Sequence, residues 1–412
     1  MATKTLRTPI LPVTELEQAE FCRPTEDLEA RPLAEEMGAH IRWQQIPTEY
    51  LHLNARQLDE RIGAARKQLG KRAIILGHHY QREEVIKYAD VTGDSFKLSQ
   101  QAAAQREAEF IVFCGVHFMA ETADTLAGPR QQVSLPNLTA GCSMADMAPT
   151  DDVLDCWDDL ARLLGEDQVL PITYMNSTAA IKALCGRNGG IVCTSSNASQ
   201  IMEWAFEQRP KVLFLPDEHL GRNTAARLGI PMEQAVLWNP FNRLGELTEE
   251  QIRDAKVILW RGHCSVHTRF KVAQVEAARE RFPNVTVMVH PECPKETVDA
   301  ADLNGSTEQI IKAVNESAPG SMWAIGTEIN LVHRLAMRNP NKTIFCLDPV
   351  VCPCSTMYRT HPAYVAWVLE ELVAGNVVNR IEVEPATKAE AKLALQRMLD
   401  VTAARTKGWD KA

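Results

Sequence analysis

The sequence predicts an α/β protein with parallel sheets, and three observations lead to this fold class. Short β-branched apolar runs recur along the chain, a polar or Gly/Pro-containing turn follows each run, and a helix-like stretch leads to the next run. Strands and helices that alternate in this way build parallel sheets with helices on both faces. With 412 residues and 45% hydrophobic content, the chain can fill more than one such core.

Ten apolar runs are expected to form the strands. In chain order they are 73–76, 110–113, 133–135, 169–173, 190–194, 212–215, 257–260, 285–289, 322–325 and 343–347. Between the seventh and eighth runs, Val272, Val275 and Ala278 repeat at helical spacing and predict a helix. Two amphipathic helices are expected at 363–375 and 387–404, with a role in packing or oligomer contacts.

The ten runs fall into three groups: first to third, fourth to seventh, and eighth to tenth. Each group opens with a polar elbow after its first strand and closes with a cysteine beyond its last strand. Because ligand sites in parallel sheets form at the carboxyl ends of strands, this layout predicts three αβα lobes around one central site. The expected ranges are 1–45 for an N-terminal extension, on the surface or partly disordered, then 46–150, 151–270, and 271–412 for the third lobe with the C-terminal helices.

Composition narrows the class of protein. The formal net charge is −9, so no overall basic field favours nucleic acid or an anionic membrane. The longest apolar runs fall far short of the ~20 residues of a membrane span, and the first residues lack the apolar core of a secretory signal. We therefore expect a soluble cytoplasmic protein whose 11 cysteines are largely reduced and serve a metal or catalysis.

Three cysteines stand out as candidate metal ligands. Cys142, Cys264 and Cys354 each lie in a loop flanked by Gly, Ser or Pro just past a strand. Soft thiolates select zinc or an iron–sulfur cluster, and three protein ligands would leave one position open for chemistry. The cysteines inside or beside apolar runs fit buried core positions instead: Cys114, Cys185, Cys193 and Cys346.

The polar elbows and hydroxyl turns supply further candidates. His290 and Glu292 flank a proline and could act as base and orienting group. His78 and His79 cannot both face one pocket on an extended backbone, so one of them is expected to be structural, and Tyr80 lies on the same side as His78. The turns at 93–95, 194–196 and 305–307 are each typical of helix N-caps, but in three units they indicate a pocket for a small anion. No GxGxxG or P-loop motif is present, so a dinucleotide or P-loop site is not supported.

Nine segments carry a resemblance to a known family. They are GHHYQREEVIKYADVTGDS, FCGVHFMAET, AGCSMADM, YMNSTAAIKA, CTSSNA, WRGHCSVHTRF, VHPECPKETVDAADLNGST, IGTEINLVHRL and CPCSTM. In this order they cover about residues 72–360, and as a set they are highly specific. The chain resembles the quinolinate synthases, iron–sulfur enzymes of de novo NAD biosynthesis. About thirty extra residues between Cys142 and Cys264, with the N-terminal extension, indicate a longer subtype.

The resemblance implies a pseudo-threefold arrangement of lobes around one [4Fe-4S] cluster, held by Cys142, Cys264 and Cys354. Cys354 is preferred to Cys352 because the family pattern places a methionine three residues after the ligand, where Met357 stands. Cys264 is preferred to Cys193 because the family's CxVH matches Cys264 to His267.

The resemblance also implies the reaction and its residues. Such transferases condense iminoaspartate with dihydroxyacetone phosphate to quinolinate, phosphate and water, with the open iron as Lewis acid. Aspartate oxidase or aspartate dehydrogenase is the expected source of the imine. Glu292 is the implied general base, and Tyr80 is an implied proton donor or orienting residue. Ser196 remains an alternative to Ser195. His267 either backs the cluster or touches the substrate. The implied substrate contacts are His78, Ser95, Tyr174, Asn176, Ser195, His290, Glu292 and Thr307.

Two other readings stay open on the sequence alone. An iron–sulfur hydro-lyase would also use three cysteines and an open iron on a small carboxylate, but it would remove water without forming a C–C bond. A zinc-binding structural module would use the same thiols without catalysis.

Overall fold

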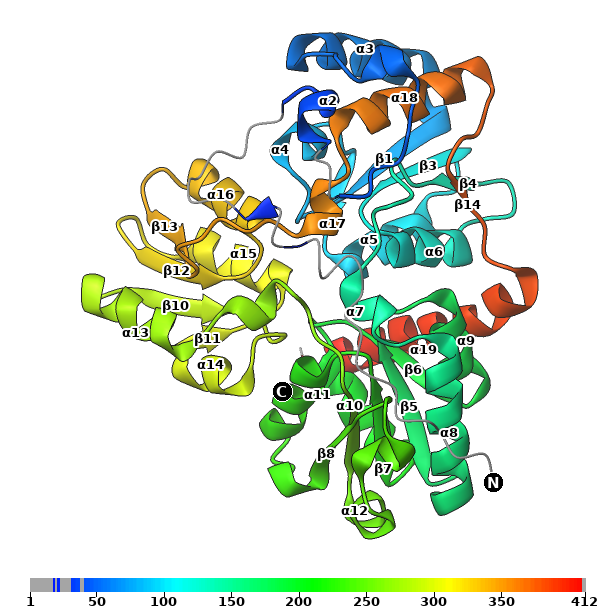
Figure 1. The fold of residues 1–412 in the computed structure, drawn as a ribbon, viewed down its shortest axis with the longest axis vertical. Helices are drawn as coiled ribbons and strands as arrows, with labels where there is room; N and C mark the ends of the chain where they lie inside the picture. The colour runs from blue at the N-terminus through cyan, green and yellow to red at the C-terminus, as the bar shows by residue number, and fades with distance from the viewer. Residues whose placement is uncertain (1–17, 19–20, 23–30, 38–40, 410–412) are drawn as a thin grey trace.

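The three predicted lobes are present and meet at the centre of the molecule (Figure 1). The structure is a computed structural model that describes residues 18, 21–22, 31–37 and 41–409. Its three sheets are almost entirely parallel, so the predicted α/β class is confirmed. All ten predicted strands occur, and each predicted group forms one sheet.

Lobe 1 is a five-stranded sheet in the order β14-β4-β3-β1-β2, in which only β14 is antiparallel. Both faces are buried: Ile74 and Leu76 pack with α5 and α6, whereas Ile75 packs with α3 and α18. Its elements are α3 (Ala55–Leu69), β1 (Ala73–His78), α4 (Glu83–Ile86), β2 (Val91–Gly93), α5 (Ser95–Ala104), β3 (Phe110–Cys114), α6 (His117–Leu126), β4 (Gln132–Ser134), α7 (Ser143–Asp146), α18 (Pro362–Ala374) and β14 (Arg380–Ile381). The short helix α17 (Ser355–Tyr358) leads from lobe 3 into α18.

Lobe 2 is a five-stranded parallel sheet in the order β6-β5-β7-β9-β8. Its strands are almost completely buried, as expected for a sheet with helices on both sides. Its elements are α8 (Thr150–Leu164), β5 (Val169–Tyr174), α9 (Ala179–Arg187), β6 (Ile191–Cys193), α10 (Ala198–Gln208), β7 (Lys211–Leu215), α11 (Glu218–Arg227), β8 (Ala235–Trp238), α12 (Glu249–Asp254) and β9 (Val257–Trp260).

Lobe 3 is a four-stranded parallel sheet in the order β11-β10-β12-β13. Val287 and Val289 pack toward α13, and Met288 between them packs toward α15 and α16. Its elements are α13 (Val272–Arg281), β10 (Thr286–Val289), α14 (Lys295–Ala300), β11 (Leu303–Asn304), α15 (Thr307–Glu316), β12 (Met322–Gly326), α16 (Ile329–Arg338) and β13 (Thr343–Cys346).

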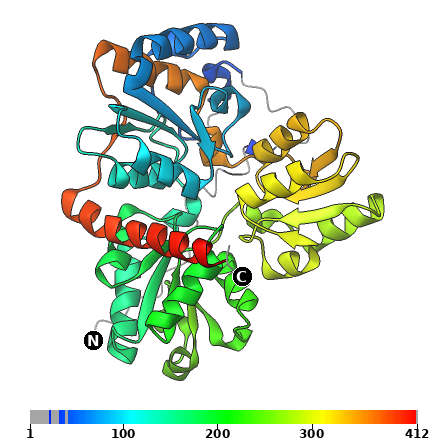
Figure 2. The same ribbon diagram turned by 180° about the vertical axis from the view of Figure 1, so that it is seen from behind.

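The C-terminal chain leaves lobe 3 and covers the other two lobes. Helix α18 packs on α3 of lobe 1, and β14 adds the edge strand to the sheet of that lobe. Helix α19 (Pro385–Trp409) then runs across lobe 2 against α9, as the red helix in Figure 2 shows. The two predicted helices are confirmed, but they do not pack on the lobe with which the sequence groups them. The predicted domain limits themselves stay predictions.

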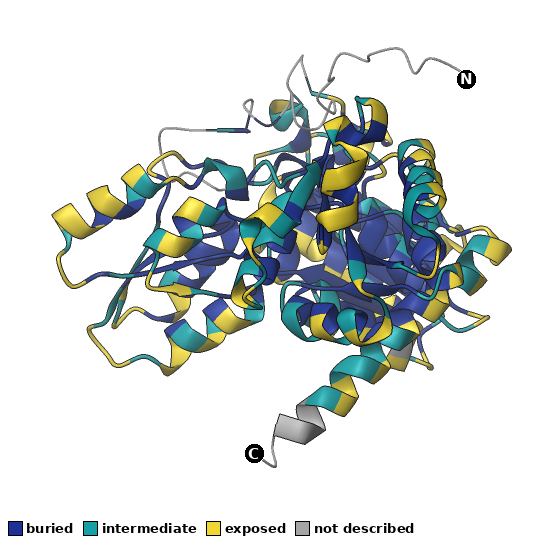
Figure 3. Ribbon diagram, turned by 90° about the horizontal axis from the view of Figure 1, so that it is seen from below, coloured by how far each residue is buried: buried dark blue, intermediate teal, exposed yellow. Residues whose placement is uncertain are grey.

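Several described residues of the N-terminal stretch are buried, contrary to the predicted surface position. Phe21, Leu33 of α2 (Leu33–Glu36), Trp43 and Ile46 all belong to the core of lobe 1. Figure 3 shows that buried positions, in dark blue, lie along the strands inside the molecule, whereas exposed positions, in yellow, lie on the outer helices. The surface prediction is therefore wrong for these residues, and the rest of the predicted extension lies outside the described residues.

Within the described residues, no helix is both long and apolar enough to cross a membrane.

Candidate active site

One cavity at the junction of the lobes collects the predicted site residues. The three cysteines, the polar elbows and the hydroxyl turns reach it from different lobes. All twelve side chains chosen from the sequence line it: His78, Tyr80, Ser95, Cys142, Tyr174, Asn176, Ser195, Cys264, His290, Glu292, Thr307 and Cys354. Their placement is as expected for one site, and their roles stay predictions.

Each candidate ligand cysteine follows the last strand that one lobe's segment of the chain contributes: β4, β9 and β13. Cys142 and Cys354 each immediately precede a four-residue helix, α7 and α17, and Cys264 follows β9. All three are free thiols, and backbone N–H groups of the next turn point at each sulfur. Burial raises the pKa of all three thiols, whereas these N–H groups favour the thiolate. Three convergent soft donors with N–H support fit an iron–sulfur cluster.

A second possible metal group shares Cys264 with this set. One donor atom each from Cys264, His267 and Glu292 lie within 4.8 Å of one another. However, His267 Nδ1 and a Glu292 oxygen are already hydrogen-bonded at 2.8 Å. The three-cysteine set is therefore the better candidate, because binding a metal there leaves this pair intact.

The other cysteines largely follow the prediction. Cys114, Cys185 and Cys193 are buried core residues, as expected. Cys346 is only half-buried, because β13 is an edge strand.

His78 and His290 present the same ring nitrogen to the cavity. In each, Nδ1 accepts a hydrogen bond from the backbone N–H two residues later, at 3.1 Å from Tyr80 and 3.3 Å from Glu292. The proton of the neutral ring therefore resides on Nε2. Burial lowers the pKa of both histidines to about 3, so both rings are neutral donors near pH 7. His79 instead pairs with Glu308 at 2.9 Å and does not line the cavity, so it is the one of the two histidines that has a structural place.

Glu292 is the centre of a buried polar network. Tyr174 donates its hydroxyl proton to one carboxylate oxygen, and His267 binds the other. Burial acts to raise the pKa of Glu292, but His267 and the hydrogen bonds from His267 and Tyr174 hold it below its ordinary value. The carboxylate is therefore ionised and fixed in direction at neutral pH.

The network continues to Tyr80 through a residue that the sequence analysis missed. Thr327 Oγ1 lies 3.0 Å from His267 Nε2 and 2.8 Å from Tyr80 Oη, and Thr307 Oγ1 lies 3.3 Å from the same Tyr80 hydroxyl. His267 thus contacts Glu292 through Nδ1 and is linked to Tyr80 through Nε2 and Thr327. The signal for Thr327 was its place directly after β12, within the IGTE segment.

Asn176 offers an acceptor without a protein partner. Its Oδ1 is buried and makes no hydrogen bond within the described part of the chain. The loop is held by Lys182, whose buried Nζ donates to the carbonyls of Met175 and Ser177 on either side of Asn176. Burial lowers the pKa of Lys182 to about 8. Because such an unpaired acceptor is costly, Asn176 is poised to accept a hydrogen bond from a ligand.

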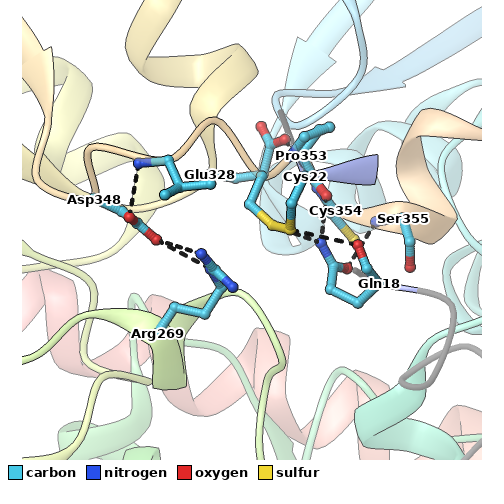
Figure 4. The surroundings of a disulfide bond; sticks show 10 residues. Gln18, Cys22, Arg269, Glu328, Asp348, Pro353, Cys354 and Ser355 are labelled. Atoms are coloured by element: carbon cyan, nitrogen blue, oxygen red, sulfur yellow. Dashed lines mark hydrogen bonds and ion pairs between the residues drawn. A yellow bond between two sulfur atoms is a disulfide. The ribbon is translucent and has the colours of Figure 1, made fainter. Parts of the chain in front are cut away.

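The N-terminal segment holds the loop of Cys354 through hydrogen bonds of Gln18 (Figure 4). The side chain of Gln18 donates to the Pro353 carbonyl at 2.6 Å and accepts from the Ser355 N–H at 3.0 Å, so it brackets Cys354. Cys22 and Cys352 form a disulfide beside it. The expectation of reduced cysteines is therefore wrong for this pair. The two residues are 330 positions apart, and the sequence gives no sign that they lie side by side in the fold.

Comparisons with known proteins point to one family. Residues 60–400 match the family described as quinolinate synthetase A protein. A quinolinate synthase of Corynebacterium glutamicum is 58% identical over 367 residues, which are 89% of this chain and 93% of that protein. Quinolinate synthases of a Nocardioides species and of Halalkalibacterium halodurans are 59% and 51% identical, over 83% and 87% of this chain and 89% and 97% of theirs.

Proposed function

The chain belongs to the quinolinate synthetase A family, and we propose that it is a quinolinate synthase, a transferase that condenses iminoaspartate with dihydroxyacetone phosphate. The balanced products are quinolinate, inorganic phosphate and two waters. The observation that carries the proposal is the cavity in which a thiol from each lobe faces an ionised carboxylate and two neutral histidines. Membership of this family favours the synthase over the hydro-lyase and the structural zinc module.

Cys142, Cys264 and Cys354 would hold the [4Fe-4S] cluster. When bound, the cluster supplies an open iron that acts as a Lewis acid on a substrate oxygen. The rest of the chemistry is assigned to side chains of the chain.

Substrate anions would be bound by uncharged donors. His78 and His290 offer Nε2–H groups, and hydroxyls reach the cavity from all three lobes at Ser95, Ser195 and Thr307. Donors fixed before the substrate arrives stabilise developing negative charge without reorganisation. Asn176 Oδ1 would accept a proton-bearing group of the substrate.

Glu292 would act as the general base. The bonds from Tyr174 and His267 keep its carboxylate ionised and directed, so that it can take a proton from a substrate carbon. Tyr80, linked through Thr327 and Thr307, would orient the substrate or return a proton in the later dehydration steps.

The test is direct synthesis under anaerobic conditions. Purified protein of known iron and sulfide content is mixed with iminoaspartate and dihydroxyacetone phosphate, and quinolinate is quantified by chromatography. We expect quinolinate and phosphate in equal amounts, and none from protein stripped of iron. Protein with a full complement of iron that forms no quinolinate would refute the proposal. The enzyme that supplies the imine, and the cytoplasmic location, stay predictions.

A further inference from the structure

The backbone around Cys354 is held by side chains that come from distant parts of the chain. Cys354 lies between β13 and α17. The Gln18 amide donates to the Pro353 carbonyl at 2.6 Å and accepts from the Ser355 N–H at 3.0 Å. An oxygen of the buried Glu328 accepts from the Cys354 N–H at 3.2 Å. The peptide groups on both sides of the candidate ligand are therefore fixed (Figure 4).

The segment that carries Gln18 also packs on the helix that follows Cys354. The Gln18 side chain is buried. The ring of Phe21 meets the ring of Tyr358, at the end of α17, edge to face with 5.4 Å between the ring centroids. The segment thus contacts both the loop before Cys354 and the helix after it. Its residues precede 60–400, the part of the chain that matches the family.

The first turn of α17 directs N–H groups at the ligand sulfur. The N–H groups of Thr356 and Met357 point at Cys354 Sγ, and the Thr356 hydroxyl lies 3.4 Å from this sulfur. The preceding N–H, that of Ser355, is the one that Gln18 binds. Because these three N–H groups belong to one turn, the Gln18 amide fixes the direction of the two that reach the sulfur. Hydrogen bonds of this kind orient metal ligands and set the reduction potential of iron–sulfur clusters.

We propose that Gln18 is a positioning residue that holds Cys354 and the first turn of α17 in the orientation that binds the cluster. The inference rests on the proposed function for the identity of the cluster. It goes beyond that function because it gives the segment before the family match a task in the site. A buried amide suits this task, because without it an N–H and a carbonyl of the loop would lose their partners.

Gln18→Met tests this role, because methionine keeps the length of glutamine without its hydrogen bonds. We expect iron to be released to a ferrous chelator about tenfold faster than from the wild-type protein. The midpoint potential of the cluster, measured by a titration followed by electron paramagnetic resonance, should fall. The reason is that N–H groups at the sulfur stabilise the more negative, reduced cluster. A substitution that only loosened the fold would leave this potential unchanged.

Gln57→Met is the matched control. The Gln57 side chain also makes a hydrogen bond, from the Asn54 N–H at 3.0 Å, but it lies at an exposed position at the start of α3. This variant should release iron like the wild-type protein. All samples are prepared without thiol reductants, so that the disulfide of Cys22 and Cys352 is the same in each. Equal iron release from Gln18→Met and Gln57→Met would overturn the inference, as would faster release with an unchanged potential.

Amide hydrogen exchange of the wild-type protein tests the role without a variant. If Gln18 holds the loop before the cluster is bound, the Ser355 N–H stays protected from exchange in protein stripped of iron. The measurement follows peptides that cover residues 354–358 by mass spectrometry. Exchange that becomes fast when iron is removed would show that the cluster orders the loop, and the inference would be wrong.

None of these measurements needs turnover, so the inference and the proposed function fail separately. Protein that makes quinolinate, while Gln18→Met keeps the iron release and the potential of the wild type, refutes only the positioning role. Iron-loaded protein that makes no quinolinate, but shows the expected effects of Gln18→Met, refutes only the synthase activity.

Discussion

At the scale of single residues, the direction of the Glu292 carboxylate is fixed from two sides. Tyr174 and His267 each occupy one of its oxygens, so the group cannot turn away from the cavity without leaving buried partners unpaired. The orientation of the Glu292 carboxylate in the site therefore depends on these two hydrogen bonds as much as on its negative charge.

Replacing Glu292 with glutamine should therefore separate turnover from cluster binding. The amide keeps the shape but cannot take up a proton, so we expect kcat to fall by about 10²–10⁴ with iron content unchanged. Glu296→Gln, at an exposed position of α14, should behave like wild type. Iron and rate are measured on the same preparation, and loss of iron in Glu292→Gln would make this residue structural instead.

The site residues that the sequence predicts are those in loops directly after strands. Lys182 and Asp94 were missed because their roles arise only when distant segments meet. A lysine in a helix is usually exposed, but the fold buries the ammonium group of Lys182 against the loop of Asn176. Asp94 has the sequence of an ordinary N-cap, and its hydrogen bond with Ser196 of lobe 2 is not visible in the sequence.

At the scale of elements, two helices approach so closely that one position must be glycine. A Cβ on Gly186 of α9 would overlap the carbonyl of Glu390 in α19. Gly63 of α3 has no atom within 4 Å of the corresponding point. The same substitution should therefore have opposite effects at the two sites.

Gly186→Ala should lower the free energy of unfolding by about 1–3 kcal/mol, because α19 must shift to make room. Gly63→Ala should raise it by about 0.5–1 kcal/mol, because alanine suits a helix interior better. Urea titration of both variants measures the difference, and equal stability would contradict the close packing of α9 and α19.

The start of α18 contains a pH-dependent cap. His361 Nδ1 accepts from the Ala363 N–H at 3.0 Å, and Nε2 lies 2.8 Å from the Arg31 carbonyl, an arrangement that suits the neutral ring. Burial, with the nearby charge of Arg82, lowers its pKa from 6.5 to about 4. Between these values the unfolded chain binds the proton and the folded chain does not, so stability falls as the pH is lowered.

From pH 7 to pH 5 this residue should cost the fold about 2 kcal/mol. His361→Asn keeps a capping acceptor without the titration, so the stability difference between wild type and variant should change by that amount over this range. Other groups titrate alike in both proteins and cancel. A difference that does not vary with pH would refute the assignment.

The strands show which elements a sequence can predict. Runs such as 110–113 and 285–289 carry enough apolar residues to be recognised alone. Strands β2, β11 and β14 have only two or three residues each, and β14 exists only because it pairs with β4, more than 240 residues earlier. Pairing over such distances leaves no local pattern.

At the scale of the whole molecule, the candidate ligands are shared equally among the lobes. We expect Cys142→Ala, Cys264→Ala and Cys354→Ala each to abolish cluster and activity, because two thiols cannot hold the cluster in place. Cys193→Ala, in the buried core of lobe 2, should keep most of both, as should Cys352→Ala. Iron and sulfide per chain are measured after anaerobic purification. If Cys352→Ala loses iron and Cys354→Ala does not, the ligand assignment in this loop is wrong.

The arrangement of lobes was predictable because each of the three groups of strands opens with a polar elbow and closes with a cysteine beyond its last strand. The contribution of the N-terminal stretch was not, since its prolines and acids suggest exposure while Phe21 and Leu33 pack into the core of lobe 1. Isolated apolar residues in an irregular segment have no periodicity by which to detect their burial.

The return of the C-terminal chain to lobe 1 has a consequence for how the protein is made. Val365 and Leu369 of α18 belong to the same core as Ile62 and Ile75, near the start of the chain, and β14 closes the edge of the same sheet. A ribosome that has released only the first two thirds of the polypeptide has therefore produced a first lobe with an open edge and an uncovered apolar face. Such a nascent chain is prone to aggregation until the last segments emerge, so fragments that end before them are poor candidates for separate expression.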